Sequence, residues 1–179
     1  RAPPKPSSAE SDVFNRQSEE NVEDNFDLIL RELSGMDNFV FQAGGGAHAA
    51  YTHCCITRAY HKSRGQLEQR NEVITSIQAH PCNPATAAAA GFHVITLPLE
   101  EDGYPSVEAL RAAVSDRTAA LLINNPDDMG IYNPHIADWV EIVHEAGGLC
   151  FYDHANFNGV MGKIRARELG FDACMYMLH

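Results

Sequence analysis

The stretch Leu149-Cys150-Phe151-Tyr152-Asp153-His154-Ala155-Asn156 is a run of apolar residues that ends in a carboxylate. Four residues with apolar side chains predict a buried strand over 149–152, and Asp153 follows at its carboxyl end. In open α/β sheets, ligands bind outside the carboxyl ends of the strands. The stretch therefore predicts both a fold class and the edge of the sheet that binds a ligand.

Apolar strands and amphipathic helices alternate along the rest of the chain. This alternation predicts an α/β fold of three layers, a mostly parallel sheet with helices on both faces. Right-handed crossovers then bring the loops that follow the strands to one edge. The predicted strands are 39–41, 72–77, 92–97, 119–123, 149–152 and 172–177, and the predicted helices are 22–33, 47–64, 83–90, 106–114 and 134–146.

The length of 179 residues suits one domain with a substantial core. Residues 1–20 are rich in Pro, Ser, Asn and acidic groups, and we interpret them as a tail or connector. Residues 21–179 form the predicted domain.

The formal net charge of −11 argues against nucleic acid and against a membrane surface as partners. No apolar run approaches the roughly 20 residues that span a bilayer. The five cysteines have no framework spacing, which favours a reducing compartment. We therefore expect a cytoplasmic protein, or a protein of the mitochondrial matrix if the source is eukaryotic.

Four segments rich in Gly, Asn, His or Asp follow predicted strands, at 42–48, 78–84, 124–130 and 153–158. The segment Ala43-Gly44-Gly45-Gly46-Ala47-His48 precedes a helix. Glycine backbone and a helix N-terminus suit a phosphate, although a tight turn is the simpler alternative. The presence of Asp153 in the same sheet favours the phosphate.

Asp153 and His80 each have two interpretations. An Asp after a strand often caps a turn, but a buried carboxylate needs a cationic partner, which a pyridinium ring supplies. An Asp in this place holds the ring nitrogen of pyridoxal phosphate (PLP) in many enzymes. His80 either stacks on a flat cofactor and acts as acid or base, or caps the following helix.

The segment 124–130 is a turn-rich loop. Its amides, Asn125 among them, are candidates for cofactor or substrate contact, and His154 is a second candidate for the substrate. We expect Asp127 and Asp128 to face water. No His-x-x-x-His pair occurs and the adjacent Cys54 and Cys55 do not have ligand spacing, so no metal is predicted.

From Gly35 to His179 the chain resembles the carboxyl-terminal, PLP-carrying half of the glycine decarboxylase family, the P-protein of the glycine cleavage system, which is subunit 2 where the enzyme is split. Several separate motifs support the resemblance. They are Gly35-Met36-Asp37, Gln42 to His48, Arg58-Ala59-Tyr60-His61, Ala79-His80, Asn83-Pro84-Ala85, Ala90-Gly91-Phe92, Glu101-Asp102-Gly103, Asn125-Pro126 with Gly130, Ile142 to Gly148, Tyr152-Asp153 with Ala155-Asn156, Met161-Gly162, Gly170-Phe171-Asp172 and Leu178-His179.

The resemblance implies the large domain of a fold-type I PLP enzyme, without its smaller C-terminal domain. It implies that Asp153 pairs with the pyridine nitrogen, that His80 stacks on the ring, and that a Schiff-base lysine directly follows His179. We therefore expect the isolated chain to be inactive and incompletely folded. The residues that the resemblance assigns to the cofactor are Gly44, Gly45, Gly46, Ala47, His48, His80, Asn83, Asp153, Ala155, Asn156 and His179.

The implied reaction is decarboxylation of glycine, with transfer of the aminomethyl group to a lipoyl carrier protein and with a partner subunit or half. The chain departs from the family pattern at Pro81-Cys82, at Asp127-Asp128, at His154 and at Ala49-Ala50-Tyr51. These changes remove hydroxyls and add charge near the substrate. Two alternatives therefore stay open: a PLP aminotransferase or lyase for another amino acid, and a non-catalytic paralogue.

Overall fold

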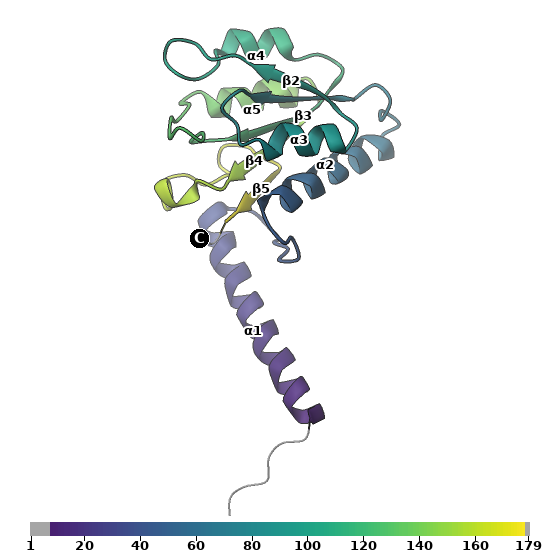
Figure 1. Cartoon of the computed structure of the whole chain (residues 1–179), viewed down its shortest axis with the longest axis vertical. Helices are drawn as coiled ribbons and strands as arrows, with labels where there is room; N and C mark the ends of the chain where they lie inside the picture. Colours follow the sequence, from purple (N-terminus) through teal and green to yellow (C-terminus); the bar gives the residue numbers. More distant parts are fainter. Residues whose placement is uncertain (1–7, 178–179) are drawn as a thin grey trace, which may run out of the picture.

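The fold is a five-stranded, all-parallel sheet between two layers of helices (Figure 1). A computed structural model of the chain describes residues 8–177, and the side chains of residues 21–177. The strand order is β2-β1-β3-β4-β5. The predicted α/β class and parallel sheet are confirmed. The strands are β1 Glu72–Ser76, β2 His93–Leu97, β3 Thr118–Asn124, β4 Leu149–His154 and β5 Ala173–Tyr176; the helices are α1 Ser8–Ser34, α2 Gly46–Ser63, α3 Cys82–Ala89, α4 Val107–Ala113 and α5 Ile136–Glu145, with a 3-10 turn at Phe157–Gly159.

Helices cover both faces of the sheet, as the alternation of segments predicts. Helices α2 and α3 pack on one face through Ala50, Cys54 and Ala87, against strand residues such as Leu122 and Phe151. Helices α4 and α5 pack on the other face, where the core includes Leu110 and Trp139. Because both faces are covered, all seven residues of the central strand β3 are buried.

Alternation along β4 assigns each of its side chains to one of these two faces. Phe151 belongs to the core on the α2/α3 side, and Tyr152 belongs to the core on the α4/α5 side. By the same alternation, Asp153 lies on the α2/α3 side and His154 on the α4/α5 side. This division decides which polar residues can share one site.

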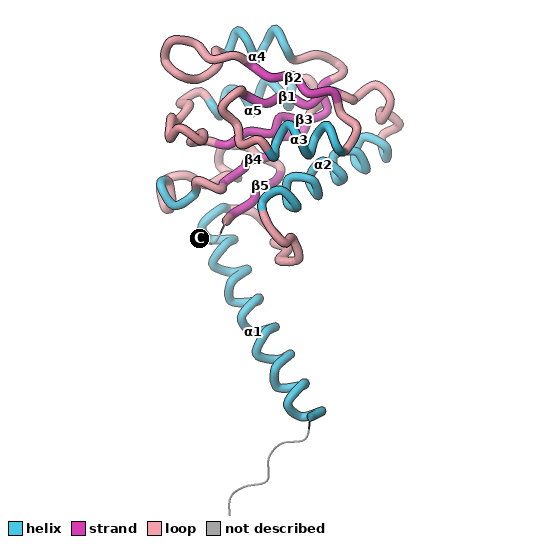
Figure 2. Tube along the Cα trace, viewed as in Figure 1, coloured by secondary structure: helices cyan, strands magenta, loops and turns pink. Residues whose placement is uncertain are grey.

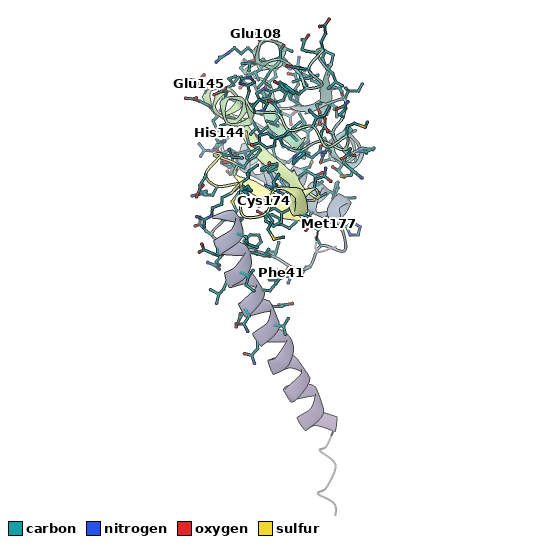
Figure 3. The ribbon with its side chains drawn as sticks, turned by 90° about the vertical axis from the view of Figure 1, so that its left-hand side faces the viewer. Phe41, Glu108, His144, Glu145, Cys174 and Met177 are labelled. Carbon is teal, nitrogen blue, oxygen red and sulfur yellow. The ribbon has the colours of Figure 1, made fainter. Side chains whose placement is uncertain are left out.

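The predicted strand at 39–41 is wrong, because this segment has no regular secondary structure and pairs with no strand among the described residues. Its aromatic side chains pack instead. The Phe41 ring lies 5.7 Å from that of Phe26 on α1, and the Phe39 ring lies 6.1 Å from that of Tyr176. Figure 3 shows Phe41 beside α1. This short apolar run thus contacts α1 and β5 through its side chains and forms no ladder.

Helix α1 begins at Ser8, well before the predicted start at Val22, and extends away from the sheet (Figure 2). It ends as predicted: Gly35 has a φ of +75°, and its N–H donates to Arg31 O at 2.8 Å. Among residues 8–177, no helix combines the length and the apolar character needed to cross a membrane.

Candidate functional site

Hydrogen bonds join three of the four predicted loops at the carboxyl edge of the sheet. The loop after β1 meets the loop after β3, where Asp128 N donates to Gln78 O at 3.4 Å. The loop after β4 meets the same loop, where Asn156 Nδ2 donates to Pro126 O at 3.1 Å. The carboxyl ends of β1, β3 and β4 therefore form one connected polar edge.

Asp153 lies at this edge and is almost completely buried, with 1% of its surface exposed. One carboxylate oxygen accepts from Asn83 Nδ2 at 3.1 Å and the other from Ala155 N at 3.1 Å. Burial raises the pKa of Asp153 above its ordinary value, and these two hydrogen bonds offset part of that shift. A carboxylate offers about four acceptor positions, so an anion with unused acceptor capacity remains.

One residue, Met175 on β5, lies between the N-terminus of α2 and Asp153. Met175 is the register partner of Asp153 on β5. A Cβ built on Gly46 would lie 3.1 Å from Met175 Cε, so the backbone of the glycine segment passes directly over Met175. Gly45 caps α2 without a side-chain hydrogen bond, which leaves first-turn N–H groups free of a side-chain acceptor. The fourth predicted loop thus reaches the same edge, with Ala47 and His48 exposed in its first turn.

His80 is exposed at the rim and combines features of both its interpretations. Its Nδ1 accepts from Cys82 N at 3.1 Å, which ties the ring to the start of α3 as a cap would. Its backbone N–H donates to Asn124 Oδ1 at 3.1 Å. The capping contact leaves Nε2 and the faces of the ring for another partner.

Asn125 and His154, the two candidates for the substrate, do not join this group. The Asn125 side chain donates to Asn133 O at 3.1 Å and accepts from Asn133 N at 2.8 Å, so it is committed to the backbone. His154 lies on the α4/α5 side of the sheet, with its ring centroid 3.6 Å from that of Tyr152. Consecutive strand residues point to opposite faces, so the sequence already contained the signal that separates His154 from Asp153.

His154 is instead a buried neutral side chain, since neither ring nitrogen has a hydrogen-bond partner. Burial lowers the pKa of His154 from 6.5 to about 3. Below about pH 6.5, His154 is therefore protonated in the unfolded chain but stays neutral in the folded chain. The free energy of unfolding falls as the pH is lowered through this range. Between pH 7 and pH 5 this residue should cost up to about 2 kcal/mol.

Urea unfolding of the full-length wild type and of its His154→Phe variant at both pH values measures this loss. The variant keeps the aromatic packing and should lose less stability on acidification. The exposed His93→Gln serves as the control and should follow the wild type. An unchanged pH dependence in His154→Phe would contradict the assignment of His154 as a buried neutral group.

The remaining polar contacts at this edge come from Ala155 and Asn156 and from two acidic residues, Asp127 and Asp128. Ala155 contributes its N–H to Asp153, and Asn156 fastens the loop after β3. Asp127 is 8% exposed and accepts from Met129 N and Ile131 N, so the expectation that it faces water is wrong. Its carboxylate closes the turn. Asp128 is exposed as expected.

The sequence analysis included Asn124 only among the amides of the loop 124–130 and assigned no structural task to Asp128. Asn124 Nδ2 donates to Asp128 Oδ1 at 2.8 Å, while its oxygen accepts from His80. Position at the end of β3 was the only signal for Asn124. The last predicted cofactor residue, His179, lies outside the described residues.

One group of possible metal ligands occurs among residues 21–177, at the opposite edge of the sheet. Atoms of His144, Cys150 and Asp172 lie within 4.8 Å of one another, and Figure 3 labels His144 on α5. The Asp172 carboxylate accepts from Cys150 N at 2.7 Å and contacts His144 Nε2 at 2.9 Å. Burial raises the pKa of the Cys150 thiol well above its ordinary value, so it is not a ready thiolate. These contacts account for the group as a link between β4, β5 and α5.

The sequence matches one set of curated proteins over most of its length. Over 150 residues it is 47% identical to the probable glycine dehydrogenase (decarboxylating) subunit 2 of Pyrococcus abyssi. The chain is homologous to this subunit. The match covers 84% of the chain but only 30% of the relative, so the chain spans about a third of the proteins that it resembles. The resemblance inferred from the motifs is confirmed, while no protein-family model matches the chain.

Solved structures agree on the fold. The SepCysS–SepCysE N-terminal domain complex superposes with a TM-score of 0.68 at 16% identity, covering 86% of this chain and 41% of the other. The sphingosine-1-phosphate lyase of Burkholderia pseudomallei gives a TM-score of 0.56 at 23% identity, covering 62% and 25%. At these identities the likeness establishes the fold alone, a parallel α/β sheet covered by helices.

Proposed function

We propose that the carboxyl edge of this sheet binds PLP, with Asp153 at the pyridine nitrogen. The observation that supports this most is the burial of Asp153 without a cationic partner among the described residues. A buried anion of this kind gains most from a cationic N–H. Bound PLP supplies an electron sink for bonds broken at the substrate's α-carbon.

The residues around Asp153 fit the other parts of such a cofactor. The first-turn N–H groups of α2 and the adjacent segment Gly44–Gly46 suit a phosphate, since a Cβ on Gly45 would meet nothing within 4 Å. The His80 ring, held through Nδ1, is available to lie against a flat ring. Asn83 acts on Asp153 by holding one oxygen in place, and Ala155 holds the other through its N–H. Asn156 fixes the loop that bounds this side.

The activity that we propose for the whole protein is that of its relatives, decarboxylation of glycine. In this proposal the aminomethyl group passes to a lipoyl carrier protein, and a partner subunit completes the enzyme. The support is the 47% identity over 150 residues together with the fit of the edge to PLP. The assignment of residues 21–179 to the PLP-binding large domain, of residues 1–20 to a connector, and of the protein to the cytoplasm belongs to the same proposal. All five cysteines are free, which suits a reducing compartment.

A second candidate is a PLP enzyme for another amino acid, and Cys82 is the observation that favours it. The Cys82 thiol is half-buried at the start of α3. Burial and the charges of Asp153 and Asp128 raise its pKa to about 11, so it stays a neutral thiol. The family pattern has a hydroxyl in this place. A less polar group at the rim would alter the choice of substrate.

Two assays on the full-length natural protein test these proposals separately. Borohydride reduction with PLP, followed by peptide mapping, should give a pyridoxyl adduct on a lysine directly after His179. Release of CO2 from carboxyl-labelled glycine should then depend on PLP and on an added lipoyl carrier. An adduct without release from glycine would favour the second candidate, and the absence of an adduct would favour a non-catalytic paralogue.

A further inference from the structure

A relay of hydrogen bonds connects Asp128 to the backbone of His80. The exposed Asp128 carboxylate accepts from Asn124 Nδ2 at 2.8 Å. Asn124 is 3% exposed, and its side-chain oxygen accepts from His80 N at 3.1 Å. The relay joins the loop after β3 to the loop after β1, and Asp128 N reinforces it by donating to Gln78 O.

The chemistry of the two side chains gives this relay a direction. A carboxylate only accepts hydrogen bonds, so Asp128 can pair only with the NH2 group of the Asn124 amide. The amide oxygen must then face His80 N–H. Flipping the amide would place two donors against each other and two acceptors against each other, in a place where Asn124 is closed to water.

The relay also acts on the His80 ring. Two hydrogen bonds restrain His80: its backbone N–H donates to Asn124 Oδ1, and its ring Nδ1 accepts from Cys82 N. Both bonds hold the segment that enters α3, and Asn83 in the first turn of that helix donates to Asp153. A shift of the His80 backbone would therefore move the ring relative to the Asp153 carboxylate.

We propose that Asp128 is a positioning residue of the candidate site, which acts through Asn124 to hold the His80 ring at the start of α3, where Asn83 contacts Asp153. This gives a task to one member of the acidic pair that departs from the family pattern. The effect on the cofactor rests on the proposed PLP site, whereas the effect on the His80 backbone does not.

The first test needs no cofactor. In the full-length protein, Asp128→Ala should speed amide hydrogen exchange at His80 by about tenfold, since one protecting bond loses its support. The exchanged pair Asn124→Asp with Asp128→Asn reverses the polarity of the first bond and keeps the net charge. The carboxylate now at position 124 then accepts from both His80 N–H and the amide now at position 128, so exchange should return toward the wild-type rate. Glu101→Gln, which removes an exposed carboxylate from the loop after β2, is the control and should change nothing.

The second test uses PLP as the probe. Asp128→Ala should weaken PLP binding by about fivefold and reduce the visible circular dichroism of the bound cofactor, and the exchanged pair should restore both. Unchanged exchange at His80 in Asp128→Ala, or failure of the exchanged pair to restore it, would overturn the proposal. If the wild type binds no PLP, the proposed function fails, and the exchange experiment still decides on the relay.

Discussion

Replacing Asp153 by asparagine is expected to lower the affinity of the full-length protein for PLP by about a hundredfold or more. Removing one member of a buried charge pair costs roughly 3–5 kcal/mol, and 1.4 kcal/mol corresponds to a factor of ten. Asparagine has nearly the same shape and keeps an oxygen for Asn83 or Ala155. The loss therefore reports the charge, and PLP titration followed by cofactor fluorescence measures it.

The stability of the cofactor-free protein should change in the opposite sense. Because burial raises the pKa of Asp153, its ionised form disfavours the folded state at neutral pH. Asp153→Asn should thus be as stable as the wild type or more stable. The exposed Asp138→Asn on α5 is the matched control and should leave both quantities unchanged. A stability loss with unaltered PLP affinity would make Asp153 a structural residue.

Arg70→Met is expected to reduce the free energy of unfolding by about 3 kcal/mol, because Arg70 closes the other edge of the sheet. Arg70 is 9% exposed, and its guanidinium donates to Thr118 O at 2.8 Å and to Ala146 O at 2.6 Å. These bonds tie the start of β3 to the C-terminus of α5, where a cation is also favoured by the helix dipole. Gly147 makes room for the group, since a Cβ there would lie 2.6 Å from Arg70 Nη2.

Arg117→Met, which removes an exposed arginine, is the control for Arg70→Met. Arg117 pairs with Glu72 at 3.0 Å, but its side chain is 52% exposed. An exposed ion pair contributes roughly 0–1 kcal/mol, so this variant should unfold at nearly the wild-type urea concentration. Equal losses in the free energy of unfolding in the two variants would show that the buried contacts of Arg70 stabilise the fold no more than the exposed ion pair of Arg117 does.

The fold could be predicted from the sequence because its strands are short apolar runs bounded by helices. The predicted strand at 149–152 lies within β4, and every predicted helix corresponds to an observed one. The segment 39–41 has the same local pattern as a strand, but pairing depends on a neighbour that no local pattern specifies. Arg70 was also beyond reach, because its partners lie 48 and 76 residues away in sequence.

The polar edge was predictable from position, whereas the partners of its residues were not. Asp153, His80 and the glycine segment each follow a strand or precede a helix, and parallel strands bring such places together. The bond from Asn83 to Asp153 spans 70 residues and depends on how α3 packs. The orientation of the Asn124 amide depends on Asp128 in the same way. Residue types and strand ends thus indicated the candidate site, and packing determined the contacts that each side chain makes there.

The ring nitrogen of bound PLP tests the central claim most directly, by 15N NMR of the full-length protein loaded with 15N-labelled cofactor. The account predicts a protonated ring nitrogen at neutral pH in the wild type and an unprotonated one in Asp153→Ala. An unprotonated nitrogen in the wild type, or the same protonated signal in both proteins, would contradict the pairing of Asp153 with the cofactor.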